Sequence, residues 1–377
     1  MQRKAGDFIA ETMTIVERAL AVPASRTPEG PQQHTVVDLA GAPVADAVTT
    51  GNGKAIAAEF VDRRTVQPAS RLAGRYLFGG VFWHHFGHFL FETITRLWAF
   101  PALRDQIDGV VFFQGRKMED TAPMHSSVLD ILGIDLPIFF IDGATEIERL
   151  YVPRQGCGYG GLVSGTPAFR QFMRDRLHRI EPANPGSRLY LSREAYGLRR
   201  GGYLAEEVLR TRLEAEGYTA YSPEQHTFRE QVATYLGATH ILGPDSSAMH
   251  LVGFSVTEAV QVGLILRRLH GDREMLPQIT GFTGRAPDVI DAITRMFRRD
   301  NMKNPTWSLL AEIDLAEVGR RLRALGFIDG RADWRSLGRH EQDQLIEACR
   351  ERFQCDLATI WTRDGSGAAI PVLVGDV

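Results

Sequence analysis

The chain is poor in cysteine, in long apolar runs and in charge of one sign. Its 377 residues include 3 cysteines, Cys157, Cys349 and Cys355. An odd number without paired zinc-type spacing predicts reduced thiols in a cytoplasmic protein. No run approaches the roughly 18 apolar residues of a membrane helix, and the acidic residues near the start argue against a signal peptide. The net charge is −3 without a lysine- or arginine-rich block, so we expect no nucleic-acid partner.

Motifs of several large enzyme classes are also missing. The sequence has no G-x-x-x-x-G-K-[ST], no convincing G-x-G-x-x-G after a strand and no G-x-S-x-G elbow. D-x-D, the carboxylate pair that clamps metal-bound nucleotide sugars in one transferase fold, is absent too. These absences disfavour ATPases, dehydrogenases and ordinary hydrolases. We therefore expect no metal site and no obligatory cofactor.

Short apolar segments alternate with helical patterns, which is typical of an α/β fold with a parallel sheet. Strands are predicted at 76–80, 109–114, 137–142 and 149–154, and again at 188–193, 219–223, 239–244 and 259–266. A break rich in Pro, Asn and Gly follows a long helical pattern at 167–181, and the alternation then restarts. We expect an α/β domain at 1–183, a Rossmann-like domain at 184–300 and a C-terminal helical extension at 301–377. An amphipathic helix is expected at the very start.

Residues 80–100, GVFWHHFGHFLFETITRLWAF, place histidines and a glutamate in an aromatic stretch. A helix here would put His84, His88 and Glu92 on one face. Because burying ionisable groups without partners is costly, such a face usually meets a cavity, a ligand or compensating charges. Three interpretations stay open: core packing of His84 and His85, a catalytic pair from His88 and Glu92, or a metal site with His84, His88 and a further ligand.

Two loops at strand ends carry polar residues. In THILGPDSSAMH (239–250) a strand runs into a helix start, where backbone N–H groups and the helix dipole favour a phosphate and Asp245 can cap the helix. In YLSREAYGLRRG (190–201), Ser192 and Arg193 follow a strand, and arginine suits phosphate oxygens. Each loop also fits an ordinary reading, a capped turn and a solvated basic loop, respectively.

The segment FGHFLFETITRLWAF resembles the N-terminal motif of bacterial glycosyltransferase family 61. Further matching positions follow in order: Ser192, Arg193, Pro223, Glu224, Glu230, Gln231, Gly243, Ser247, Ala248, Met249 and His250. The resemblance runs from about residue 76 to 266. Two departures stand out, because Thr95 replaces the usual proline and Asp245-Ser246-Ser247 replaces a histidine-glycine-alanine turn.

The resemblance implies an inverting glycosyltransferase with two Rossmann-like domains facing a cleft (GT-B-like). Its donor would be a nucleotide sugar, which we expect to be a UDP-sugar, and its acceptor a saccharide or glycolipid. Relatives are associated with capsular or other surface polysaccharides. Peripheral contact with the inner face of the inner membrane and a homo-oligomer stay open. The alternatives are a non-catalytic nucleotide- or sugar-binding subunit of a polysaccharide assembly complex, and a metal-dependent hydrolase built on His84, His88 and Glu92.

On this resemblance we assign residues to two sides of the reaction. His88 is the expected base, because an imidazole titrates near operating pH, and Glu92 either orients it or is the base itself. The acceptor side also receives His84, His85 and Arg96, with Arg96 pairing with Glu92. Glu230 and Gln231 are expected to contact the nucleotide. The donor phosphates are expected to meet Ser192, Arg193, Gly243, Asp245, Ser246, Ser247 and His250.

Overall fold

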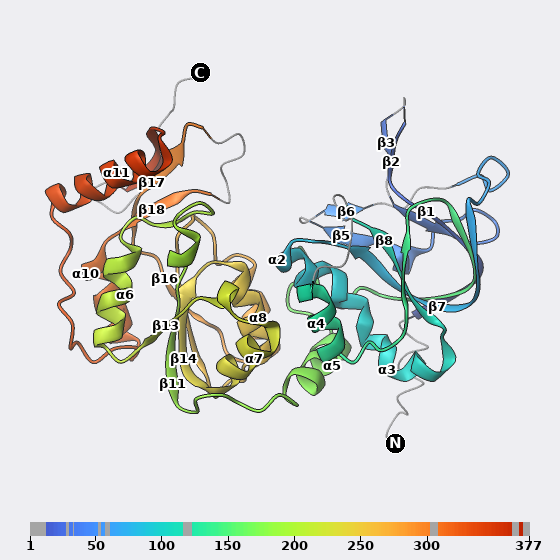
Figure 1. Ribbon diagram of the computed structural model, residues 1–377, viewed down its shortest axis with the longest axis horizontal. Coiled ribbons are helices and arrows are strands. Elements are labelled where there is room, and N and C mark those ends of the chain that lie inside the picture. The colour runs from blue at the N-terminus through green and yellow to red at the C-terminus, as the bar shows by residue number, and fades with distance from the viewer. Residues whose placement is uncertain are drawn as a thin grey trace. The chain divides into compact units, whose positions relative to one another are not determined.

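The computed structural model in Figure 1 describes residues 13–27, 30–32, 34–51, 54–56, 61–115, 123–301, 308–363 and 369–371. The chain divides into two units, Met1–Ile180 and Glu181–Val377, which are considered separately below. The expected limit at residues 183/184 falls in the same connection, between α5 (Pro167–Leu177) and β11 (Ser187–Leu191).

The first unit contains a mixed sheet of six strands in the order β4-β1-β10-β7-β8-β9. The last four strands of this order run parallel, whereas β1 pairs antiparallel with both β10 and β4. A purely parallel, Rossmann-like sheet was therefore the wrong expectation for this unit. The strands are β1 (Met13–Val22), β4 (Thr35–Val37), β7 (Ser70–Phe82), β8 (Gly109–Gln114), β9 (Ile138–Ile141) and β10 (Thr145–Pro153).

The error arises in the segment MTIVERALAV, whose described residues form β1 instead of an amphipathic helix. Its β-branched residues favour a strand, and its second half, Ala19 to Val22, is buried. Pairing along β10, from Met13 opposite Pro153 to Ala21 opposite Thr145, supplies long-range contacts that helical periodicity does not register. Residues 1–12 lie outside the described part of the chain.

The other predicted elements of this unit are confirmed, with changes in length. Strand β7 contains the expected segment 76–80, and its pairing with β8 changes register between Phe78 and Gly80; an added Cβ on Gly79 would lie 2.1 Å from the Phe112 ring. Glycine is required there because β7 passes directly over that ring. The remaining elements are α4 (Pro123–Ile131), η1 (Ala45–Ala47) and the short hairpins β2 (Ser25–Thr27) with β3 (Gly30–Gln32) and β5 (Thr49–Gly51) with β6 (Lys54–Ile56).

The second unit contains the parallel sheet that the sequence predicts. Its order is β13-β11-β14-β15-β16, with every pairing parallel. Chain order reverses between β11 and β14, and in open α/β sheets ligands bind outside the carboxyl ends of the strands at such a switch point. The strands are β13 (Thr219–Tyr221), β14 (Ala238–Pro244), β15 (Gln261–Ile265) and β16 (Asp288–Ile290). The connecting helices are α6 (Glu206–Ala215), α7 (Phe228–Gly237), α8 (Ser247–Ser255) and α9 (Met275–Thr283), with η5 (Glu194–Tyr196) and η6 (Pro223–Gln225).

The expectation of a purely helical C-terminal extension was wrong. A second, mixed sheet of this unit has the order β12-β18-β17-β19-β20, and three of its strands lie beyond residue 300. Within the expected extension, residues 308–327 read as one helix but form strand β18 followed by α10 (Leu315–Ala324), because Leu310 to Ile313 are buried on both faces and fit a buried helix equally well. The strands are β12 (Gly202–Tyr203), β17 (Ile293–Arg299), β18 (Leu310–Ile313), β19 (Leu357–Arg363) and β20 (Ala369–Pro371). Helix α11 (Arg339–Phe353) agrees with the helical part of the expectation.

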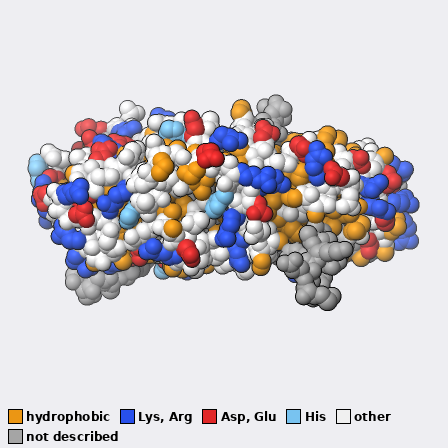
Figure 2. All heavy atoms as spheres, turned by 90° about the horizontal axis from the view of Figure 1, so that it is seen from below, with side chains coloured by type: hydrophobic (Ala, Val, Ile, Leu, Met, Phe, Trp, Pro, Cys, Tyr) orange, Lys and Arg blue, Asp and Glu red, His pale blue; other side chains and the backbone are white. Residues whose placement is uncertain are grey.

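Three general features concern membrane-spanning helices, cysteines and surface charge. In the described residues, no helix has the length and apolar character that spanning a membrane requires. All three cysteines are free thiols. On the face shown in Figure 2, basic and acidic side chains are interspersed.

Candidate functional site

The segment that follows β7 is helical but not one regular helix. It comprises α2 (Phe86–His88), a π-helical turn η2 (Phe89–Thr93), a 3₁₀ segment η3 (Ile94–Ala99), α3 (Phe100–Leu103) and η4 (Arg104–Gln106). His84 and His85 precede the first turn and are exposed, so core packing of these two side chains was the wrong interpretation. The π-helical turn holds Glu92, and turns of this kind are frequent at functional sites.

His88 and Glu92 form a hydrogen-bonded pair. His88 Nδ1 lies 2.8 Å from Glu92 Oε2, with the imidazole side chain 32% exposed and the carboxylate side chain only 1% exposed. Because an ionised carboxylate only accepts, Nδ1–H is the donor, and a neutral His88 then carries its lone pair on Nε2. Glu92 therefore orients His88, and His88 is the member of the pair that solvent or a substrate can reach.

Aromatic rings surround His88 on this surface of the first unit. The rings of Trp83, His85 and Tyr159 lie with their centroids 6.0, 5.6 and 5.9 Å from that of His88. Tyr159 comes from the loop after β10 and also contacts Phe91, at 4.9 Å. His88 thus projects from a partly exposed aromatic surface.

Arg96 does not pair with Glu92, contrary to expectation. Its side chain is fully buried, and the guanidinium donates to the carbonyl oxygens of Pro153, Asp46 and Val48 at 3.1, 2.9 and 2.8 Å. Burial lowers its pKa to about 10. Arg96 therefore anchors the helical segment to the end of β10 and to the segment around Asp46 and Val48. We no longer assign it to the acceptor side.

In the second unit, Ser192 and Arg193 stand at the carboxyl end of β11 as expected. Glu206, at the start of α6, accepts from Arg193 N at 3.0 Å and from the Tyr190 hydroxyl at 2.7 Å, and Ser192 Oγ lies 3.4 Å from the same oxygen. Burial raises the pKa of Glu206. Ser192 is 3% exposed, so its hydroxyl shapes the loop from inside instead of presenting a donor to a phosphate.

The Arg193 side chain is held by the loop that follows β11. Its guanidinium donates to the carbonyl oxygens of Arg200 and Gly201 at 2.8 and 3.3 Å, and it lies over the Tyr196 ring at 5.0 Å. Burial lowers the pKa of Arg193. The alternative interpretation of this loop as simply solvated therefore does not hold for Arg193, which is partly buried and bonded to carbonyl groups of the loop, and the phosphate contact stays a prediction.

Asp245 does not cap α8, which corrects the sequence-based assignment. Its carboxylate is 0% exposed and accepts from Arg267 N at 2.7 Å and from Arg268 Nε at 2.5 Å. An added Cβ on Gly271 would lie 2.4 Å from this carboxylate, so glycine is required where the loop after β15 wraps around it. Arg267 is 4% exposed, and burial lowers its pKa to about 9.

The start of α8 presents backbone groups at the end of β14. Ser246 is the N-cap residue in extended conformation, and its side chain makes no capping hydrogen bond within the described part of the structure. The first N–H groups of a helix have no intrahelical partner, so Ser247 and its neighbours keep the anion-binding character that the sequence suggested. Gly243 permits close packing, because a Cβ there would lie 3.0 Å from Met249 Sδ.

Three other expected donor contacts have structural roles. His250 is 4% exposed, and its Nδ1 lies 2.5 Å from Gln278 Oε1, which joins α8 to α9. Glu230 closes a capping box with Thr227 at the start of α7. Gln231 is 7% exposed and donates to the carbonyl oxygens of Pro223 and His226, at 2.8 and 3.1 Å. His250 and Gln231 are therefore buried away from any ligand, whereas Glu230 is exposed but has its carboxylate engaged in the capping box.

Sequence reasoning missed Glu206, Arg267 and Arg268. The two arginines directly follow the predicted strand at 259–266, so the rule that selected Ser192 and Arg193 would also have selected them. Nothing in the sequence marks Glu206 in this way. In the stretch AEEV, Glu206 and its neighbour Glu207 both fit an exposed helix start, so the sequence does not show which of the two is buried. Its burial depends on the tertiary contacts of Tyr190.

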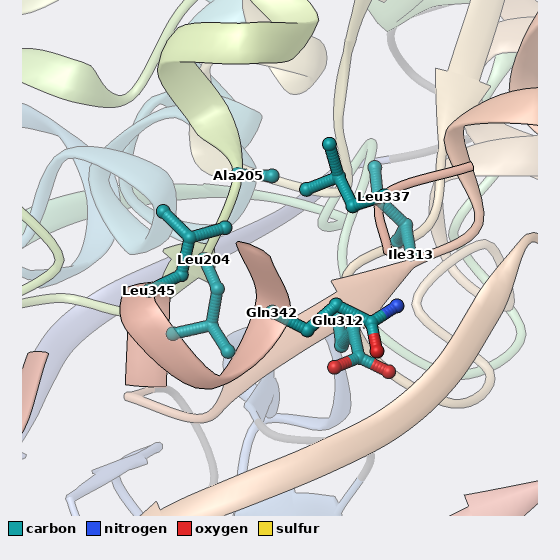
Figure 3. Close-up of a pocket in the computed structure, with 7 residues that line it drawn as sticks. All are labelled: Leu204, Ala205, Glu312, Ile313, Leu337, Gln342 and Leu345. Carbon is teal, nitrogen blue, oxygen red and sulfur yellow. The ribbon is translucent and has the colours of Figure 1, made fainter. Parts of the chain in front are cut away.

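A small pocket in the second unit, shown in Figure 3, is not lined by Glu206, Arg267 or Arg268. It is lined by Leu204, Ala205, Glu312, Ile313, Leu337, Gln342 and Leu345. Glu312 is already bonded to Arg295 at 2.5 Å. The cavity, about 10 Å³, is barely large enough for one water molecule. It is therefore a gap in the packing and too small for a ligand. Across the described ranges, no group of three or more His, Cys, Asp or Glu side chains is placed to hold a metal ion.

Comparison with known proteins shows similarity to one family model. Residues 86–262 match the family model described as Glycosyltransferase 61. The matched segment contains His88 and Glu92 as well as Ser192, Arg193 and Asp245, and it ends before Arg267. No curated protein matches the chain.

Proposed function

We propose that the protein is a glycosyltransferase, on the basis of the family match of residues 86–262, and that it transfers a sugar from a nucleotide-sugar donor to a saccharide acceptor with inversion. One observation carries the proposal: within the matched segment, the half-buried His88 is oriented by the buried carboxylate of Glu92. A base held in one tautomer by a carboxylate is what proton removal from an acceptor hydroxyl requires.

The first unit serves the acceptor in this proposal. His88 Nε2 takes the proton of the acceptor hydroxyl as its oxygen attacks the anomeric carbon of the donor sugar. The bond between that carbon and the diphosphate oxygen breaks, and the nucleoside diphosphate leaves with the electron pair. Attack from the side opposite the leaving group inverts the anomeric centre. Glu92 stabilises the imidazolium that forms, because its oxygen already accepts from Nδ1–H.

The second unit serves the donor. Its carboxyl strand ends bring together Arg193, Arg267 and Arg268, whose charges influence one another, with the two buried carboxylates of Asp245 and Glu206. This excess of guanidinium groups, with the N–H groups at the start of α8, suits a diphosphate and its leaving charge without an obligatory metal. A UDP-sugar, the GT-B arrangement, a cytoplasmic location and a role in surface or capsular polysaccharide synthesis belong to the same proposal.

A second candidate is a non-catalytic nucleotide- or sugar-binding subunit of a polysaccharide assembly complex. The observation that favours it is the 2.5 Å ion pair between Asp245 and Arg268, because the carboxylate occupies an arginine that a donor phosphate would otherwise use. Hydrolysis or transfer of a nucleotide sugar by the purified protein separates the two candidates.

The proposal is tested with a thermal-shift panel of UDP, GDP, CMP, ADP and TDP, each in EDTA and with magnesium or manganese. A ligand at about 100 times its dissociation constant stabilises the folded state by roughly 2.7 kcal/mol. We expect one nucleotide to raise the unfolding midpoint in EDTA. A shift that needs metal would overturn the metal-free site, and no shift with any nucleotide would contradict the donor assignment.

A further inference from the structure

His125 on α4 is a buried histidine that lies beneath the turn carrying His88. Its side chain is 0% exposed, and its Nε2 lies 3.0 Å from the backbone oxygen of His84. Because a carbonyl oxygen only accepts, Nε2–H is the donor, and the neutral ring then has a bare Nδ1. The His125 ring also packs on Phe89, with centroids 4.6 Å apart. It therefore contacts the turn just before His85 and just after His88.

This turn has little regular structure of its own. Helix α2 contains only Phe86–His88, and its N-cap residue, His85, makes no side-chain capping bond within the described residues. The π-helical turn that follows replaces the regular hydrogen-bond ladder. One further contact fixes the entry, where Thr93 Oγ1 accepts from Trp83 N at 2.8 Å. The direction of His88 thus depends on contacts from outside the turn.

A buried polar atom of His125 is left unsatisfied by this arrangement. Its Nδ1 has no hydrogen-bond partner in the part of the chain that the structure describes. A purely apolar ring would pack against Phe82 and Phe89 without that cost. Packing of the ring alone therefore does not explain a histidine at this position. The hydrogen bond from its Nε2–H to the His84 carbonyl oxygen does.

We infer that His125 is a positioning residue for His88. By holding the His84 carbonyl and supporting Phe89, it fixes the turn on which His88 and Glu92 meet, so that Nε2 of His88 stays free to act as the base. The inference rests on the proposed function for its catalytic meaning, but the positioning itself is a property of the free protein.

Three substitutions at His125 separate the effect of its N–H hydrogen-bond donor from the effect of its ring packing. His125→Gln places an amide N–H near the position of Nε2, whereas His125→Asn is too short and places its N–H near Nδ1. His125→Phe keeps the packing and removes both the donor and the unsatisfied acceptor. His178→Asn, an exposed histidine of the same unit, is the matched control.

The first readout is the tautomer of His88 in the ¹⁵N-histidine-labelled full chain at about pH 8, where an ordinary histidine is neutral. Long-range ¹H–¹⁵N spectra, assigned with His88→Gln, distinguish Nδ1–H from Nε2–H. We expect Nδ1–H in the unsubstituted protein, in His125→Gln and in the control, and a mixture in His125→Asn and His125→Phe. Thermal midpoints are measured in parallel, and His125→Phe is expected to remain as stable as the unsubstituted protein.

Transfer or hydrolysis of the nucleotide sugar is the second readout. Misplacement of a reacting group by about 1 Å can cost up to 100-fold, so we expect kcat to fall roughly tenfold to 100-fold in His125→Asn and His125→Phe with KM for the donor unchanged. An unchanged His88 tautomer in His125→Phe would overturn the inference, whatever the activity. A changed tautomer in a protein without transfer activity would leave the positioning intact and contradict the proposed function instead.

Discussion

The two candidate regions of this protein are built in opposite ways. The donor region stands on a regular parallel sheet, where three strand ends, β11, β14 and β15, deliver their polar residues to one edge. The acceptor region stands on a helical segment that changes from α to π to 3₁₀ geometry and is held by distant residues. In the first case the repeating geometry of the sheet places the groups, and in the second individual buried contacts do.

This difference predicts where each region is vulnerable. A strand end tolerates the loss of one side chain, because the neighbouring strands keep its backbone in place. The irregular helical segment relies on single anchors such as Arg96 and His125, so one substitution is expected to disturb the whole turn. The following experiments test that contrast, from the largest expected effect to the smallest.

The largest effect is expected from His88→Ala in the acceptor region. Removing a general base typically costs 10²- to 10⁴-fold, so we expect transfer to collapse by about that factor. Nucleotide binding should remain, because the donor groups lie on the other unit. Single-turnover rates with saturating donor measure this, and an unchanged rate would remove His88 from the mechanism.

Arg96→Met tests the anchoring of the helical segment. It leaves the carbonyl oxygens of Pro153, Asp46 and Val48 without their donor, at about 1–3 kcal/mol each, so we expect a loss of at least about 3 kcal/mol in the free energy of unfolding. Urea denaturation measures it. Arg154→Met is the matched control, because the Arg154 side chain is 69% exposed and its pair with Asp46 should contribute little. Equal effects of the two substitutions would contradict the anchoring role.

Glu216 provides a pH-dependent test of the scaffold in the second unit. Its buried carboxylate accepts from Ala332 N at 2.9 Å and Gly330 N at 3.0 Å, and these N–H donors hold its pKa at about 2. Since this lies below the ordinary value of 4.5, the contribution to stability is complete above pH 4.5 and is lost as the pH falls towards 2.

The shift corresponds to about 3 kcal/mol at neutral pH, so Glu216→Gln should destabilise the protein strongly at pH 7 and much less near pH 3. Glu214→Gln is the control, because Glu214 is 41% exposed and pairs with Arg210 on the surface. A Glu216→Gln effect that does not shrink on acidification would contradict the assigned pKa.

The same contrast explains what could be predicted from the sequence. Strands β11, β13, β14 and β15 of the parallel sheet, and the positions of Ser192 and Arg193 at a strand end, follow from alternating apolar runs whose order fixes the sheet edge. The pairing of His88 with Glu92 was also accessible, because residues four apart on a helix face each other. The π-helical turn, the burial of Arg96 and the capture of Asp245 by Arg267 and Arg268 were not, because each depends on partners distant in the chain.

The assignment of Asp245 shows why local patterns failed there. Directly before a helix, aspartate is a common N-cap, and the sequence around it supports that role. The contacts that decide its position come from residues 22 and 23 positions further along the chain. Local periodicity therefore predicted the turn itself but not which way its carboxylate points.

The central claim is that donor binding belongs to the second unit and proton removal to the first. Calorimetric titration of the nucleotide selected by the thermal-shift panel, in EDTA, tests it with the unsubstituted protein, Arg193→Ala and His88→Ala. Loss of a charged hydrogen bond costs about 1.5–3 kcal/mol, so Arg193→Ala should weaken binding roughly tenfold to 100-fold, with His88→Ala unchanged. Equal weakening in both variants, or none in Arg193→Ala, would contradict this division of tasks.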